Sequence, residues 1–137
     1  MKHVLFDTNI ILDIALQRAP FFATACQLFD KIEEGEIKGF VTTSTVTDIY
    51  YIARKSLGKR ESIAFIHELV EIVELLNVTK ESIIDALNTE FEDFEDAVQS
   101  CVAGINFIDI IVTRNISDFI HSAVEVCTPT QLIEKFK

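Results

Sequence analysis

The chain has 137 residues, of which 49% are hydrophobic, and a formal net charge of −10. This size and apolar content predict a single domain spanning residues 1–137, and no apolar run approaches the roughly 20 residues of a membrane-spanning helix. The strong negative charge argues against nucleic-acid binding, unless divalent cations or a basic partner offset it.

Short apolar, β-prone runs alternate with helical patterns along the whole chain. In chain order, the expected elements are a strand over 3–6, helices over 10–18 and 20–34, a strand over 39–42, helices over 44–57 and 59–73, a short strand over 74–78, helices over 79–91 and 92–106, a strand over 107–113, a polar turn leading into a short helical segment over 114–119, a strand over 123–129 and a helix over 130–137. Pro20 marks one helix start, and Gly35 and Gly58 mark two helix ends.

Strands that alternate with helices predict a parallel sheet whose two faces are both covered. The expected fold is therefore α/β, a three-layer sandwich with a central parallel sheet of four to five strands flanked by helices. Ligands of such sheets bind at the carboxyl ends of the strands, so functional residues are expected there.

The three cysteines, Cys26, Cys101 and Cys127, are widely spaced and form no CxxC pair. An odd number of scattered cysteines indicates small buried residues in a reducing cytoplasm. Neither a disulfide nor a thiolate metal site is expected.

Polar and acidic side chains follow several of the predicted strands. Asp7 comes directly after the first strand, Asp48 lies one turn into the helix after the second, and Asn115 and Asp118 follow the fourth. Asp96 lies in the first turn of a further helix. These five side chains can converge on one cleft at the edge of the sheet.

Clustered carboxylates repel one another unless a cation joins them, and oxygen ligands of this kind suit Mg²⁺ or Mn²⁺. Such an ion polarises a phosphoryl oxygen and activates water, so the pattern indicates phosphodiester hydrolysis. Another interpretation is that the acids are only helix caps and first-turn residues favoured by the helix dipole, Asp93 above all. Spacing alone leaves both interpretations open.

Four stretches of the chain carry a resemblance to a known family. FDTNIILDIAL, TTSTVTDIYYIARK, DFEDAVQSCVA and FIDIIVTRNISDF resemble, in order, the successive motifs of PIN-domain ribonucleases, most closely the small VapC-like bacterial toxins. The resemblance covers nearly the whole chain. It implies a Mg²⁺- or Mn²⁺-dependent endoribonuclease that is cytoplasmic, usually homodimeric and silenced by a small cognate antitoxin.

The resemblance also assigns roles to residues. Asp7 and Asp96 match metal ligands of the family. Asp48 stands where the family usually has Glu, which is one methylene longer, and Asn115 stands where many members have Asp, which leaves Asp118 as the nearby carboxylate. The polar residues matching those that hold such ligands in place are Thr8, Asn9, Ser44 and Thr113.

Four basic residues within seven positions, Arg54, Lys55, Lys59 and Arg60, are either a solvated helix end or contacts to the RNA backbone. The departures at Asp48 and Asn115 raise an alternative function, a catalytically weakened PIN-fold module that binds RNA or protein. A phosphohydrolase or receiver-like domain, with Asp7 as nucleophile or phospho-acceptor, is a third hypothesis. The lack of a DxDxT-type pair after the first strand argues against it.

Overall fold

The computed structural model describes residues 1–137 and contains one sheet of five parallel strands. The strands lie in the order β3-β2-β1-β4-β5, so the first strand of the chain is the central one. Their bounds are β1 (Lys2–Phe6), β2 (Ile37–Thr42), β3 (Glu74–Leu76), β4 (Ile110–Val112) and β5 (Glu125–Cys127).

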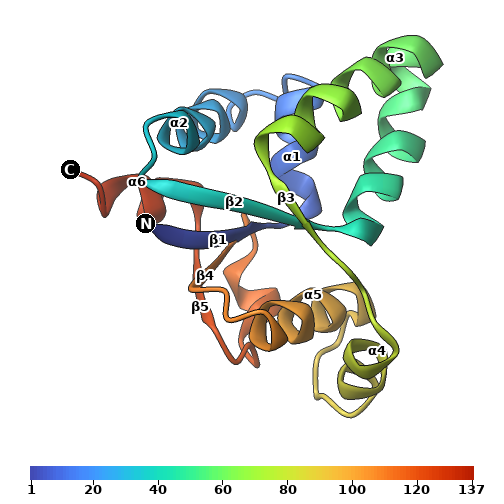
Figure 1. Cartoon of the computed structure of the whole chain (residues 1–137), viewed down its shortest axis with the longest axis vertical. Coiled ribbons are helices and arrows are strands. Elements are labelled where there is room, and N and C mark those ends of the chain that lie inside the picture. Colours follow the sequence, from blue (N-terminus) through green and yellow to red (C-terminus); the bar gives the residue numbers. More distant parts are fainter.

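Helices cover both faces of this sheet (Figure 1). They are α1 (Thr8–Ala15), α2 (Phe22–Glu33), α3 (Thr43–Ile72), α4 (Lys80–Leu87), α5 (Phe94–Ile105), the short 3₁₀ helix η1 (Ile116–Phe119) and α6 (Pro129–Glu134). The first three and α6 pack on one face, and α4, α5 and η1 on the other. The predicted three-layer α/β sandwich is confirmed. None of the helices combines the length and apolar content needed to cross a membrane.

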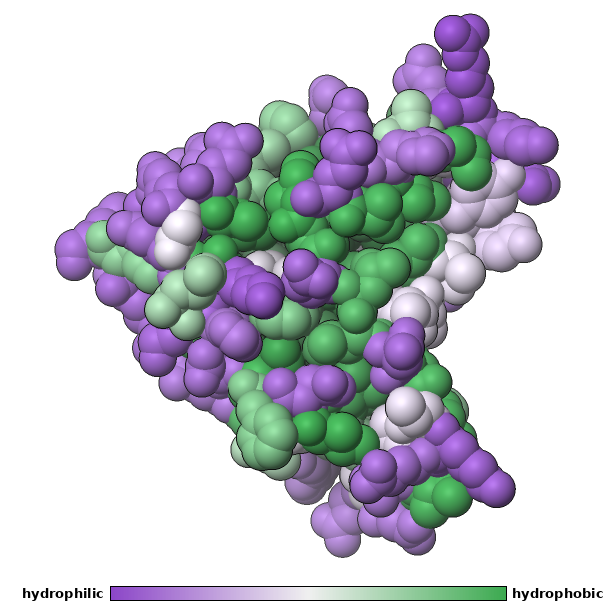
Figure 2. Space-filling model, in the orientation of Figure 1, coloured by the Kyte–Doolittle hydropathy of each residue, from purple (hydrophilic) through white to green (hydrophobic).

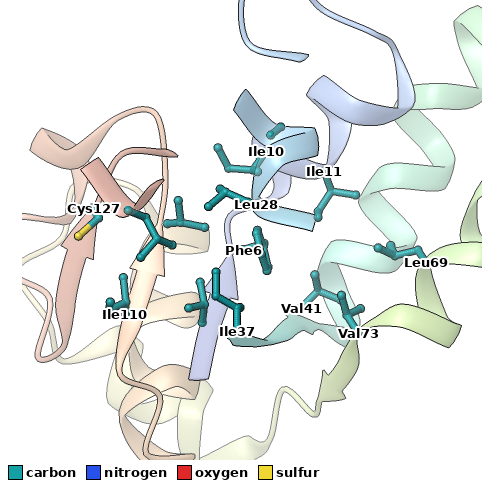
Figure 3. Close-up of a cluster of buried hydrophobic side chains, with 14 of the residues drawn as sticks. Phe6, Ile10, Ile11, Leu28, Ile37, Val41, Leu69, Val73, Ile110 and Cys127 are labelled. Carbon is teal, nitrogen blue, oxygen red and sulfur yellow. The ribbon is translucent and has the colours of Figure 1, made fainter. Parts of the chain in front are cut away.

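The central place of β1 follows from its sequence. Val4, Leu5 and Phe6 are all fully buried. Successive side chains of a strand point to opposite faces, so Val4 and Phe6 enter the larger core cluster while Leu5 enters the smaller one. Figure 3 shows Phe6 surrounded by residues of the larger cluster from α1, α2 and α3. An unbroken apolar run is what a strand buried on both faces requires.

Several element ends differ from the predicted ones. The second helix begins at Phe22 instead of Pro20, and the helix expected over 79–91 ends at Leu87. The helix expected over 92–106 begins at Phe94, because the Asp93 side chain caps it by accepting a hydrogen bond from the backbone N–H of Asp96. All three cysteines are free thiols, but only Cys127 is buried.

The break expected at Gly58 is present inside α3. Its φ of +80° is non-helical and separates the two halves of this 30-residue element. Positive φ favours glycine, because other residues are strained there. The first half of α3, which contains Asp48 near its start, leads the chain away from the end of β2. The second half returns the chain to the sheet at β3.

Gly39 allows α2 to approach β2 closely. A Cβ at this position would lie 2.7 Å from Ile32 Cδ1, 3.1 Å from Phe6 Cε2 and 3.2 Å from Val73 Cγ1. Gly39→Ala is therefore expected to lower the free energy of unfolding by about 1–3 kcal/mol, because three packed side chains must shift. Urea denaturation of the purified variant measures this.

Gly104→Ala, in α5, is the matched control. Nothing lies within 4 Å of a Cβ at Gly104, and its backbone is helical. Alanine there is expected to be neutral or to stabilise the protein by up to about 1 kcal/mol. Equal losses in the two variants would contradict the close approach at Gly39.

Candidate active site

At the carboxyl edge of the sheet, β1 runs into α1 and β2 runs into α3 (Figure 1). A pocket of about 360 Å³ lies at this edge. The start of α5 and the segment around η1 complete it. Six carboxylates line the pocket: Asp7, Asp48, Asp93, Glu95, Asp96 and Asp118. Its other lining residues are Thr8, Asn9, Leu12, Ile52 and Asn115, so no lysine or arginine offsets the negative charge.

Asp7 is the most firmly held of these carboxylates. It occupies the N-cap position of α1, yet its side chain makes no capping hydrogen bond. Instead Oδ1 accepts a hydrogen bond from Gln99 Nε2 (2.9 Å) and Oδ2 accepts one from Thr113 Oγ1 (2.8 Å). Burial raises the pKa of Asp7, although both hydrogen bonds oppose the shift. This geometry excludes the simple helix-cap interpretation for Asp7.

A chain of hydroxyl groups leads to Glu95. Thr42 Oγ1 donates to Thr45 Oγ1 (3.1 Å), which lies 2.9 Å from Thr8 Oγ1. Thr8 Oγ1 in turn donates to Glu95 Oε1 (3.3 Å). Burial raises the pKa of Glu95, and the negative charge of Asp48 raises it further. The Glu95 carboxylate is thus held beside the carboxylates of Asp7 and Asp48.

Asp96 has a strongly raised pKa. Burial and four neighbouring carboxylates, Asp7 first among them, raise its pKa from 3.8 to about 7. In contrast, Asp93 serves as the cap of α5 while it also lines the pocket. The raised pKa favours the protonated form of Asp96 near neutral pH, unless a cation takes the place of the proton.

The chemistry of the donor set fits a hard divalent cation. The pocket offers carboxylate, amide and hydroxyl oxygens and contains no histidine or cysteine, which matches the preference of Mg²⁺ and Mn²⁺. No three acidic, histidine or cysteine side chains are already arranged around one point as metal ligands. The carboxylates lie around a shared space rather than in a closed coordination shell.

The structure brings most of the sequence-predicted site residues together. Those that line the pocket are Asp7, Thr8, Asn9, Asp48, Asp96, Asn115 and Asp118. Thr113 is fully buried beneath it and bonds to Asp7. Ser44 does not line the pocket, and its hydroxyl lies 3.0 Å from that of Thr42. Asn115 and Asp118 both line the pocket, so both remain candidates for a fourth metal ligand beside Asp7, Asp48 and Asp96.

The basic residues lie elsewhere. Arg54, Lys55, Lys59 and Arg60 are on α3, outside the pocket, and their side chains contribute no lining to it. The Arg54 guanidinium lies 5.9 Å from the centre of the Tyr50 ring. Their position agrees with either a solvated helix surface or contacts to a polyanion.

Sequence reasoning missed Glu95 and Gln99. Gln99 is fully buried and holds Asp7 through its amide. Both residues lie on the side of α5 that carries Asp96, since Gln99 follows Glu95 by four residues and Asp96 by three. For Gln99, the available signal was a long polar side chain that directly follows the apolar residues Ala97 and Val98.

A buried ion pair behind the pocket was missed as well. Asp13, fully buried in α1, lies 2.8 Å from Arg114 Nε and 3.6 Å from Arg18 Nη1. The Arg114 guanidinium also lies over the Phe21 ring, 4.0 Å from its centre. These contacts anchor the loop after β4 that carries Thr113 and Asn115.

The chain resembles known proteins over most of its length. The family model described as "PIN domain" matches residues 3–117. The chain is 24% identical to the ribonuclease VapC1 of Aquifex aeolicus, over 98% of this chain and 96% of that protein. Among solved structures it is similar to VapBC2 from Rickettsia felis bound to a promoter DNA fragment (TM-score 0.70, 15% identity, 92% of this chain and 98% of that one) and to a toxin–antitoxin complex from Klebsiella pneumoniae (TM-score 0.69, 22% identity, 92% and 97%). The chain belongs to the PIN-domain family.

Proposed function

We propose that this protein is a Mg²⁺- or Mn²⁺-dependent endoribonuclease that acts as the toxin of a toxin–antitoxin pair, formed by one domain over residues 1–137. The observation that carries the proposal is the pocket with six carboxylates and no basic side chain, built from four separate segments of the chain. Membership of the PIN-domain family and similarity to a VapC ribonuclease support the same activity.

Asp7, Asp96 and Asp48 would hold the metal ion, with Asn115 or Asp118 in the fourth position. A bound ion would supply Lewis-acid chemistry there: it would polarise a phosphoryl oxygen and lower the pKa of water. The chain itself positions these ligands. Gln99 and Thr113 fix both oxygens of Asp7.

The partners follow from charge and from the comparisons. Similarity to a solved toxin–antitoxin complex supports a small cognate antitoxin for this chain too. A net charge of −10 suits a partner that presents a basic side chain to the acidic pocket. We further propose that the protein is a cytoplasmic homodimer.

Cleavage of RNA by the purified protein, freed of any partner, tests the proposal. Labelled RNA is expected to be cut internally with Mg²⁺ or Mn²⁺ and to stay intact with a chelator. RNA that remains intact at all metal concentrations would contradict the nuclease and favour a binding module. Calorimetry with Mn²⁺ then shows whether the pocket takes metal at all.

Asp48 bears on the alternative function, a catalytically weakened PIN-fold module that binds RNA or protein. Its carboxylate lines the pocket one methylene short of the glutamate usual in the family. Asp48→Glu is therefore expected to raise kcat/KM for RNA about tenfold, because the longer side chain reaches the shared space directly. Asp48→Asn is the matched control and is expected to lower it. Equal activities of all three proteins would show that residue 48 takes no part in the reaction.

A further inference from the structure

The first half of α3 carries one continuous side beside the acidic pocket. Asp48 and Ile52, four residues apart, line the pocket. Tyr51 and Lys55 follow Asp48 by three and seven residues, so they lie on the same side of the helix. The opposite side is fixed in the core, where Ile49 is fully buried.

Two apolar side chains on this outer side are left uncovered. Tyr51 is 63% exposed and Ile52 is 41% exposed. The Tyr51 ring meets the Tyr50 ring edge to face, with a centroid distance of 5.2 Å and an interplanar angle of 79°. The molecule is hollowed between α3 and the α4–α5 pair in the space-filling view (Figure 2). Asp48 and Ile52, on the same side of α3 as Tyr51, line the pocket. A planar partner can therefore reach the Tyr51 ring.

The charged residues that follow Tyr51 along α3 indicate the chemical class of this partner. Residues 49–60 carry four cations, Arg54, Lys55, Lys59 and Arg60, and no carboxylate, in a chain of net charge −10. Lys55 itself is exposed. An exposed aromatic ring beside a row of cations matches a nucleic-acid strand, whose bases stack on aromatic rings while its phosphates bind lysine and arginine.

Only an unpaired base suits this position. Bases within a duplex are covered by their neighbours, whereas unpaired bases present their faces for stacking on aromatic side chains. We propose that Tyr51 stacks on a base of single-stranded RNA next to the cleavage site, while Lys55 binds a neighbouring phosphate. The proposal rests on the proposed function and adds the residue of α3 that contacts the RNA beside the cut.

The absence of tryptophan from the chain allows a direct test. Tyr51→Trp, combined with Asp7→Asn so that RNA is not cut, places a single tryptophan at the stacking position. Titration with a single-stranded oligonucleotide is expected to quench its fluorescence by at least half. The same oligonucleotide annealed to its complement is expected to leave the fluorescence nearly unchanged. Anisotropy of labelled RNA reports binding independently.

Phe107→Trp in the same background is the matched control. Phe107 is 88% exposed and precedes β4, so it lies at the opposite edge of the sheet from the pocket. The fluorescence of this variant is expected to stay constant with either form of RNA. Equal quenching at both positions would reveal a non-specific effect and overturn the proposal.

Affinity gives a second readout. Tyr51→Ala is expected to weaken binding of single-stranded RNA about tenfold, while Tyr51→Phe, which keeps the ring, stays within about twofold. The proposal fails if the tryptophan of the Tyr51→Trp protein is not quenched at saturating RNA, if duplex quenches it equally, or if no RNA binds. It also fails if the signal follows protein concentration, which would identify a second copy as the occupant. RNA cleavage by the wild-type protein is scored separately, so failure of the proposed function is distinguishable.

Discussion

Asp7→Asn is expected to reduce RNA cleavage by at least about 100-fold while the protein remains folded. Asparagine keeps the shape of the side chain and removes its charge. Asp7 is only 6% exposed and lies where the sheet, α1 and α5 meet. The loss would therefore arise from the missing carboxylate and not from a rearranged pocket.

The stability of Asp7→Asn shows whether lost cleavage comes from the missing carboxylate or from a rearranged pocket. Burial raises the pKa of Asp7, so its ionised form costs free energy in the folded protein. The Gln99 amide can turn so that its Oε1 atom, which has no partner in the native protein, accepts from asparagine. Urea unfolding is therefore expected to show an unchanged or higher free energy of unfolding at neutral pH.

Asp30→Asn is the control for this prediction. Asp30 lies on α2, outside the pocket. Its loss is expected to leave cleavage unchanged. More than a tenth of native cleavage in Asp7→Asn would exclude Asp7 from the metal site.

The metal-free protein is expected to lose stability as the pH rises from about 4 to about 7. Asp96 has a pKa of about 7 in the folded protein against an ordinary 3.8, so the folded state binds more protons in this range. The free energy of unfolding falls with pH wherever the folded state binds more protons than the unfolded state. The raised pKa values of Asp7 and Glu95 act in the same direction.

Mn²⁺ is expected to reverse this loss, because a cation binds the deprotonated carboxylates. The melting temperature without metal should be roughly 5 °C lower at pH 8 than at pH 5, and Mn²⁺ should raise it mainly at pH 8. Scanning fluorimetry with a chelator or with Mn²⁺ measures both. Asp96→Asn should flatten the dependence on pH, and an unaltered slope in that variant would assign the effect to other groups.

The sequence was sufficient for the sheet and for most of the carboxylates. Val4, Leu5 and Phe6 fill both faces of β1 and so place Asp7 at the edge of a buried strand. Local spacing also placed Asp96 at a helix start. The helix-cap interpretation of Asp93 is confirmed, since its side chain accepts a hydrogen bond from the backbone N–H of Asp96 at the start of α5.

The contacts that hold the site were beyond the reach of local patterns. Gln99 contacts Asp7 across 92 residues of sequence, and Arg114 contacts Asp13 across 101. Which side of α5 meets β1 depends on the order of the strands, and an apolar pattern does not fix that order. Glu95 was missed for the same reason.

The central position of β1 has a consequence during translation. Its neighbour β4 is made about a hundred residues later, since Val4 pairs with Ile110. Asp118, the last residue of the pocket, follows β4. A nascent chain therefore lacks part of the pocket until residues 110–118 have left the ribosome.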